Sequence, residues 1–448
     1  MTARAGTTIE ATITDLALEG RGVAREGGLV LFVEGALPGE RVRLRIERVR
    51  RAFAEGRALA ILEPSPDRVT PPCPHYDSCG GCDLQHLATA AQAEAKRRQV
   101  AAALRRIAGL GDIDVRPTVP APDPFGYRFR MDFDWLPGAA GPRLGLHRRH
   151  AAGVVVPIDR CLLAGEETAA IVRLAPQEAA RLHLTTWDPR RRRGLLRRLS
   201  VQEARGTREV LISLETGRGD PPAIGAFAAA LARRFPRLVG VVRHEVGHDG
   251  RPAGASILAG RDYLHEELEG DRWRIPSDAF FQPNPAGSLL VRRHAIAACR
   301  LRIGATLLEL YAGVGFFTVA AARAGARVVA VEGTAAACAA GRDNTRRFGE
   351  ACRFVHDDVA AALPSLIGDA WDAVLLDPPR AGLAPAGVRC LAEARLPRLV
   401  YVSCDPGTMA RDLGRLVREG GWRLAEVTPF DIFPQTQHLE AVAVLERV

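Results

Sequence analysis

Hydrophobic and polar positions follow two different patterns along the chain. In RVRLRIERV, residues 41–49, apolar residues alternate with arginines, the period-two pattern of a half-buried strand with its arginines in solvent. Glycines punctuate residues 8–62 as turns, so this stretch predicts an OB-like, five-stranded β-barrel. From about residue 125 to 275, short strand-like runs such as YRFRMDFDW and REVLISLE continue.

From about residue 280 onward, long apolar runs alternate with helical stretches rich in alanine and arginine. The runs ATLLELYAG, ARVVAVEG, WDAVLLDPP and RLVYVSCDP end in glycine, acid or proline. That alternation is typical of an α/β fold with a Rossmann-like, doubly wound parallel sheet. The patterns predict three domains: a barrel over residues 1–65, a central mostly β domain over residues 66–275 and the doubly wound domain over residues 276–448.

The net charge of the chain indicates what kind of partner it binds. The formal net charge of +9 comes mostly from arginine, which favours a phosphate-bearing partner such as nucleic acid, although a GC-rich genome enriches arginine as well. The run Arg190–Arg193 fits a solvated loop and an RNA contact equally. The amino terminus lacks the apolar core of a signal peptide, and no apolar stretch is long enough to span a bilayer. We therefore expect a cytoplasmic protein without membrane contact.

Glycines and acids at predicted strand ends indicate a cofactor site. Gly313 and Gly315 in ELYAGVGFFT follow one strand, and Glu332 ends the next, where a carboxylate can accept both ribose hydroxyls. Both a nicotinamide cofactor and S-adenosylmethionine fit this pattern. Without a full G-x-G-x-x-G, and with Asp358 and Asp377 at later strand ends, the methyltransferase interpretation is favoured over the dehydrogenase one. The alternatives are purely structural roles, a turn acid for Asp358 and a helix N-cap for Asp377.

A cysteine at a strand end provides a candidate nucleophile. Cys404 lies between the strand RLVYVS and a predicted helix, whose dipole favours the thiolate; the alternative is a buried small hydrophobe. Thiolate addition at carbon 6 of uracil makes carbon 5 nucleophilic enough to accept a methyl group. Glu440, which opens the last apolar strand, is the candidate base for the carbon 5 proton. Asp431 and His438 are weaker candidates with orienting roles.

Five motifs together resemble the uracil-5 RNA methyltransferase family over essentially the whole chain: IPSDAFFQPN, LELYAGVGFFT, LLDPPRAG, SCDPGTMARDL and HLEAVAVLERV. The stretch LEGRGVAREGGLVLFVEGALPGERV resembles the family's TRAM domain. The resemblance implies that Cys404 is the nucleophile and Glu440 the base. It also implies a set of S-adenosylmethionine contacts, namely Gln282, Tyr311, Glu332, Asp358 and Asp377, to which the pattern above adds Gly313 and Gly315.

Cysteines cluster in CPHYDSCGGC, residues 73–82, and clustered thiols in a reducing compartment indicate metal binding or catalysis. The resemblance to family members specific for ribosomal RNA implies a [4Fe-4S] cluster, held by Cys73, Cys79, Cys82 and Cys161, that orients an RNA-binding surface. Thiolates alone suit iron–sulfur and zinc equally, but the spacing lacks the paired CxxC of a zinc ribbon.

Two residues depart from the family pattern. Asp405 stands where asparagine is usual, and its carboxylate would raise the pKa of Cys404 unless it points away. Phe316 replaces a usually polar residue in the glycine loop.

We expect a monomeric enzyme that makes 5-methyluridine in RNA. We expect 23S ribosomal RNA as the substrate rather than transfer RNA, whose enzymes commonly lack both the barrel and the cysteines. A cytosine-5 methyltransferase and a noncatalytic iron–sulfur RNA-binding protein are the other candidates.

Overall fold

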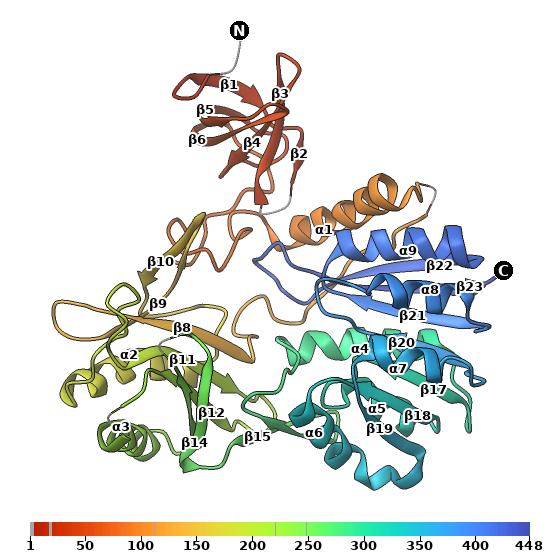
Figure 1. The fold of residues 1–448 in the computed structure, drawn as a ribbon. Helices are drawn as coiled ribbons and strands as arrows, with labels where there is room; N and C mark the ends of the chain where they lie inside the picture. Colours follow the sequence, from red (N-terminus) through yellow and green to blue (C-terminus); the bar gives the residue numbers. More distant parts are fainter. Residues whose placement is uncertain (1–3, 18–19, 112, 220, 248) are drawn as a thin grey trace.

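The amino-terminal strands follow the alternation of apolar and basic residues. The computed structural model describes residues 4–17, 20–111, 113–219, 221–247 and 249–448 (Figure 1). Within these residues, six strands rather than five form the first sheet, in the order β1-β5-β6-β4-β3-β2, because a two-residue strand is added. The strands are β1 (Thr8–Thr12), β2 (Asp15–Leu16), β3 (Gly22–Glu26), β4 (Leu29–Glu34), β5 (Arg41–Val49) and β6 (Phe53–Glu63).

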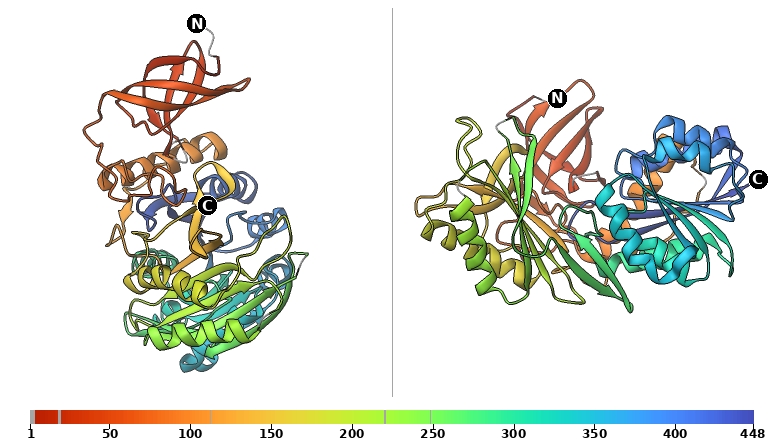
Figure 2. Two further views of the ribbon diagram at one scale, coloured as in Figure 1. Left: turned by 90° about the vertical axis from the view of Figure 1, so that its left-hand side faces the viewer. Right: turned by 60° about the horizontal axis from the view of Figure 1, so that its bottom comes forward.

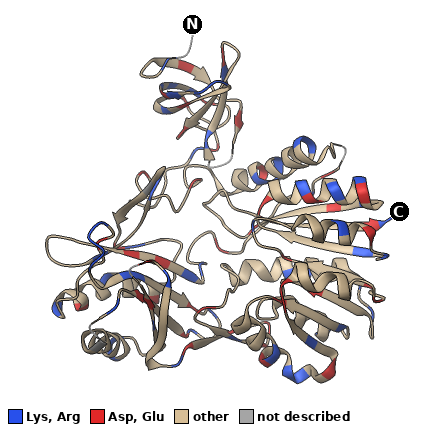
Figure 3. Ribbon diagram, in the orientation of Figure 1, with Lys and Arg blue, Asp and Glu red and all other residues tan. Residues whose placement is uncertain are grey.

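Apolar and basic residues of β5 lie on opposite faces, as the sequence pattern predicts. Val42, Leu44 and Ile46 are buried in the core of this sheet. Arg41 on the solvent side pairs with Glu10 and Glu63, and basic and acidic segments lie together in this part of the chain (Figure 3). Arginines of this strand are therefore partly neutralised by neighbouring carboxylates.

A seven-stranded sheet forms the centre, in the order β10-β9-β8-β11-β12-β13-β14. Helices α2 (Glu166–Arg181) and α3 (Pro221–Arg234) pack on it through apolar residues such as Ile171 and Phe227. A separate hairpin of β15 (Tyr263–Leu268) and β16 (Asp271–Pro276) follows the sheet. The sheet strands are β8 (Arg130–Leu136), β9 (Arg143–Arg148), β10 (Ala151–Pro157), β11 (Leu196–Glu203), β12 (Val210–Thr216), β13 (Leu238–Val246) and β14 (Pro252–Gly260).

An eight-stranded sheet forms the carboxyl-terminal part, in the order β19-β18-β17-β20-β21-β23-β22-β7. Its first five strands run parallel, as predicted, whereas β23 runs antiparallel to both of its neighbours. The strands are β7 (Val119–Pro120), β17 (Thr306–Leu310), β18 (Arg327–Glu332), β19 (Cys352–His356), β20 (Ala373–Leu376), β21 (Arg398–Ser403), β22 (Trp422–Asp431) and β23 (Glu440–Arg447).

Helices cover both faces of this sheet (Figure 1). One apolar core includes residues of α4, α5 and α6, and a second includes residues of α7, α8 and α9. The helices are α4 (Pro285–Cys299), α5 (Phe316–Arg323), α6 (Ala335–Thr345), α7 (Val359–Leu366), α8 (Pro385–Glu393) and α9 (Pro406–Gly420). This is the predicted doubly wound fold, built from apolar runs that are buried on both sides.

Helix α1 (Thr89–Ala103) belongs in space to the carboxyl-terminal part although it precedes the central sheet in sequence (Figures 1 and 2). Val100 and Leu104 join the core beneath α9, and β7 pairs with β22 at the sheet edge. The chain thus reaches the β22 edge of this sheet before it forms the central one. The division at residues 65 and 275 therefore stays a proposal.

No helix of the described ranges is long and apolar enough to cross a membrane. The cytoplasmic location and the monomeric state stay predictions.

Candidate active site

Strand ends gather the candidate residues at one edge of the parallel sheet. Strand β17 lies between β18 and β20, so strand order changes direction there. In open α/β sheets, ligands bind in the crevice at such a switch, at the carboxyl ends of the strands. Tyr311, Asp377 and Cys404 directly follow β17, β20 and β21.

The glycine loop after β17 is shaped by left-handed backbone. Tyr311 has φ 64°, Gly313 56° and Gly315 88°, and Gly315 is the N-cap of α5. A Cβ added to Gly313 would meet no atom within 4 Å, so the backbone there faces open space that a ligand can approach closely. Phe316, the first residue of α5, is buried against Trp273 and takes no polar part in the loop.

Glu332 is already tied to this loop. Its carboxylate accepts the N–H of Gly313 at 2.9 Å and the N–H of Thr334 at 2.7 Å. The acid at the end of β18 therefore lies beside the glycine loop, as the strand spacing predicts.

Asp358 and Asp377 have different surroundings. Asp358 is exposed, caps α7 by accepting the N–H of Ala361 at 3.1 Å, and with burial raises the pKa of Tyr311. Asp358 is thus a helix N-cap, and its charge lies close to Tyr311. Asp377 is not a helix N-cap: helix α8 begins at Pro385, and the amide of Gln282 donates to the Asp377 carboxylate.

Two of the candidate acids, Asp377 and Glu440, line the same narrow pocket. Gln282, Asp377 and Glu440 line it together with Phe316 and Val402. Burial raises the pKa of Asp377 to about 7. Burial and the neighbouring Asp377 raise the pKa of Glu440 as well, because two close carboxylates resist double ionisation.

Cys404 lies beside the same acids. Burial, followed by the charges of Glu440 and Asp377, raises the pKa of the thiol to about 11. The extra carboxylate of Asp405 is engaged as a helix cap. It accepts the N–H of Thr408 at 2.8 Å at the start of α9, and the carboxylates that raise the pKa of Cys404 are those of Glu440 and Asp377.

Arg380 is a residue that the sequence reasoning missed. Its guanidinium donates a hydrogen bond to the sulfur of Cys404 and lowers the pKa of both Cys404 and Glu440 against the effect of burial. It also donates to Nδ1 of His438 at 3.2 Å. Burial, with Arg380 next, lowers the pKa of His438 to about 4, so that ring is neutral. The sequence feature that could have identified Arg380 is its position directly after the acid-proline-proline stretch of LLDPPR.

The four cysteines implied to hold a cluster lie around one cavity of about 280 Å³. Burial raises the pKa of the Cys79 and Cys161 thiols, and that of Cys82 to about 12. Within the described ranges, no three His, Cys, Asp or Glu side chains are arranged to hold a single metal ion. Four thiols are a donor set that suits a four-iron cluster and a zinc ion alike.

The remaining cysteines have no such arrangement. Cys299 and Cys338 are buried in apolar cores, and Cys352 and Cys390 are half-buried away from the cavity.

Comparison with known proteins identifies similar families. Residues 3–59 match the TRAM domain, and residues 227–349 and 366–448 match tRNA (Uracil-5-)-methyltransferase. A Gloeobacter violaceus protein named as an uncharacterized RNA methyltransferase is 36% identical, over 99% of this chain and 97% of its own length. A Thermotoga maritima protein of the same description is 32% identical, over 95% and 96%.

One solved structure resembles nearly the whole chain. It is Pyrococcus abyssi tRNA (uracil-54, C5)-methyltransferase in complex with S-adenosyl-L-homocysteine, with a TM-score of 0.75 and 26% identity. The match covers 98% of this chain and 100% of the other, so it includes the amino-terminal barrel.

Replacing Arg380 with glutamine should slow alkylation of Cys404 by iodoacetamide at pH 8 roughly tenfold or more. Loss of the cation raises the pKa of the thiol further, which reduces the thiolate fraction at any pH below that pKa. Peptide mass spectrometry of Cys404 measures the rate. Arg389→Gln, at an exposed arginine of α8, is the control, and equal rates in both variants would contradict the assigned role.

Proposed function

This chain belongs to the tRNA (uracil-5-)-methyltransferase family of S-adenosylmethionine-dependent RNA methyltransferases, and from that premise we propose that it methylates carbon 5 of a uridine through a covalent bond to Cys404. One observation carries the proposal. Cys404, Arg380 and Glu440 lie together beside the glycine loop of a doubly wound sheet.

Each of the three groups has a distinct part. The thiolate of Cys404 adds to carbon 6 of the uracil, and the electron pair of the 5,6 double bond makes carbon 5 nucleophilic. S-adenosylmethionine, when bound, supplies an electrophilic methyl group. Glu440 then takes the proton from carbon 5, the double bond re-forms, and the Cys404 sulfur leaves carbon 6.

The electrostatics suit both steps. Arg380 stabilises a thiolate that burial and two carboxylates oppose, so it supports addition. Burial beside Asp377 raises the pKa of Glu440, which makes its ionised form a stronger base. A cytosine-5 reaction would need an acid at ring nitrogen 3. We favour uracil because the family model and the solved relative both name that base.

Residues at the switch in strand order would hold S-adenosylmethionine. The open backbone face at Gly313 and the adjoining Glu332 carboxylate suit a ribose, and Tyr311 and Asp358 lie together at the next position along the crevice. The proposed contacts are Gln282, Tyr311, Gly313, Gly315, Glu332, Asp358 and Asp377.

The cysteine cavity supports a [4Fe-4S] cluster held by Cys73, Cys79, Cys82 and Cys161. The raised pKa values of Cys79, Cys82 and Cys161 mean that these three thiols would release protons as they bind iron. Arg128, Arg130 and Arg160 line the same cavity, so we propose that a bound cluster orients these arginines toward RNA.

We propose 23S ribosomal RNA as the substrate on the strength of the four cysteines. The barrel no longer supports this choice, because the relative that acts on transfer RNA matches this chain over its whole length. Transfer RNA is therefore the second candidate. We further propose that the barrel of residues 1–65 binds RNA, that residues 66–275 carry the cluster, and that residues 276–448 carry catalysis.

Incubation with 5-fluorouridine-substituted RNA and S-adenosylmethionine should produce a protein–RNA adduct that survives denaturation, since fluorine cannot leave carbon 5 as a proton does. Separate reactions with 23S ribosomal RNA and with transfer RNA identify the substrate class. The adduct should disappear in Cys404→Ala and persist in Cys390→Ala. If neither RNA forms an adduct, catalysis is refuted and the noncatalytic iron–sulfur RNA-binding protein is favoured.

Glu440→Gln should add the methyl group but release RNA at least about 100-fold more slowly, because the proton on carbon 5 has no base. Covalent RNA should then accumulate with ordinary uridine, measured on denaturing gels. Glu446→Gln, at the far end of the same strand, serves as the control. Rapid turnover by Glu440→Gln would remove Glu440 from the role of base.

Anaerobic purification should yield a brown protein with about four irons, the number expected for a cubane held by four thiolates. Cys161→Ser should lose the iron and the visible absorbance, whereas Cys390→Ser should keep both. One zinc per chain in place of iron would refute the cluster.

A further inference from the structure

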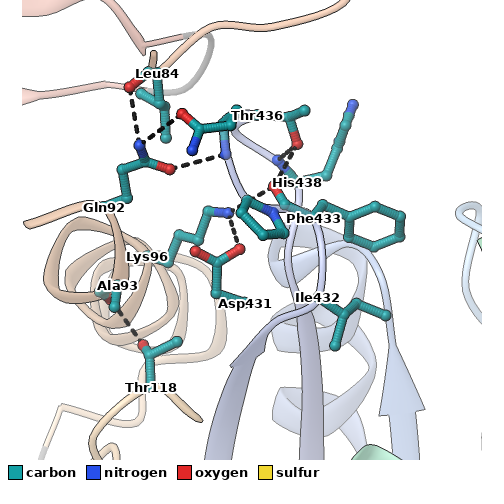
Figure 4. Close-up of polar contacts among 12 residues, drawn as sticks. Leu84, Gln92, Ala93, Lys96, Thr118, Asp431, Ile432, Phe433, Thr436 and His438 are labelled. Atoms are coloured by element: carbon teal, nitrogen blue, oxygen red, sulfur yellow. Dashed lines mark hydrogen bonds and ion pairs between the residues drawn. The ribbon is translucent and has the colours of Figure 1, made fainter. Parts of the chain in front are cut away.

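The loop between β22 and β23 leads to Glu440, which lines the pocket. Residues that do not belong to this sheet hold the loop by hydrogen bonds. Asp431 ends β22 and Glu440 begins β23. The residues between them contact α1 and the segment directly after Cys82, both more than 300 positions earlier in the chain (Figure 4). Such contacts set where β23 begins.

The side-chain amide of Gln92, in α1, hydrogen-bonds to this loop through both its nitrogen and its oxygen. Its Nε2 donates to the side chain of Gln435 at 3.1 Å, and its Oε1 accepts the backbone N–H of Gln435 at 2.9 Å. The same Nε2 lies 3.0 Å from the carbonyl of Leu84 and 2.8 Å from that of Leu87. Gln435 has φ 71°, a left-handed conformation that a non-glycine residue keeps only when its surroundings hold it.

The cysteine-bearing segment holds the same residue from the other side. The N–H groups of Asp83 and Leu84 both donate to the carbonyl of Gln435, at 3.0 and 2.9 Å. The Asp83 carboxylate accepts the N–H of Gln437 at 3.2 Å. Because Cys82 directly precedes Asp83, one segment of the chain both lines the cysteine cavity and hydrogen-bonds to the loop before Glu440.

Lys96, one turn further along α1, holds the start of the loop. Its Nζ lies 2.5 Å from the Asp431 carboxylate and donates to the carbonyl of Phe433 at 3.1 Å. Lys96 is 0% exposed and Asp431 1%. A buried ion pair is costly to break by removing one partner, so its geometry is strongly maintained.

We propose that Gln92, Lys96 and Asp83 are positioning residues that hold Glu440 within reach of the carbon 5 proton, an inference that rests on the function proposed above. They act through the loop and touch neither Glu440 nor Cys404. The step they govern is therefore proton removal rather than thiolate addition. Cys404 is positioned separately, by β21 and by the cap of α9.

Helix α1 does not depend on Gln92 for its place. Val100 and Leu104 anchor the helix in the core beneath α9, and Thr118 donates to the carbonyl of Ala93 at 2.8 Å. Gln92→Ala should therefore free the loop while α1 stays packed. Gln99 lies on the same helix, and its buried amide has no hydrogen-bond partner among the residues that the structure describes, so Gln99→Ala is a matched control.

Single-turnover reactions with the RNA that the wild type methylates separate the two steps. Gln92→Ala should add the methyl group at a rate within about twofold of the wild type, yet release RNA on the order of 10- to 100-fold more slowly, since small displacements of a reacting group have effects of this size. Covalent RNA should accumulate, as in Glu440→Gln. Gln99→Ala should release RNA normally.

Amide hydrogen exchange gives a readout that needs no RNA. Residues 433–439 should exchange faster in Gln92→Ala than in Gln99→Ala, while α9 remains protected in both. If Gln92→Ala does not fold, Asp83→Ala, which removes the acceptor of the Gln437 N–H, carries the same test.

Unchanged release and exchange would overturn the inference, and so would a parallel loss of addition and release, which would indicate a general structural role. A wild type that methylates no RNA refutes the proposed function instead. A working wild type with normal release in the variant refutes only the positioning role.

Discussion

The proposed nucleophile and the residues beside it depend on one geometric constraint, the common direction of strands in a parallel sheet. Because β17, β20 and β21 run the same way, the residues that follow them emerge at the same edge. Tyr311, Asp377 and Cys404 are tens of residues apart in the chain and become neighbours for this reason. The change in strand order beside β17 opens the crevice into which they face.

Within that crevice, the cost of burying a charge has the largest effect on the pKa values of the proposed reacting groups. Asp377, Glu440 and Cys404 each lose hydration. Asp377 also raises the pKa of Glu440, and both carboxylates raise the pKa of Cys404. Arg380 opposes this effect at both the sulfur and Glu440. A site built from one buried acid, two half-buried acids and a nearby guanidinium can give up and take back protons one at a time, which suits addition followed by proton removal.

The base reaches the site by a different route from the nucleophile. Cys404 follows a parallel strand, whereas Glu440 begins an antiparallel strand after a loop. Helix α1 and the cysteine-bearing segment hold that loop by hydrogen bonds. The early part of the chain therefore has a role besides the proposed binding of RNA, because it holds the loop from which β23 begins.

The sequence by itself determined the features that depend on local periodicity and on residue type. The apolar runs predicted the doubly wound sheet, and their ends identified the glycine loop, Glu332 and the residue after each later strand. Only the tertiary structure decided that Arg380 contacts Cys404, that Asp405 caps a helix, and that α1 packs against the carboxyl-terminal sheet and holds the loop before Glu440. Strand patterns record which face of an element is buried, but contacts between residues hundreds of positions apart arise when whole elements pack, and no local pattern encodes that choice.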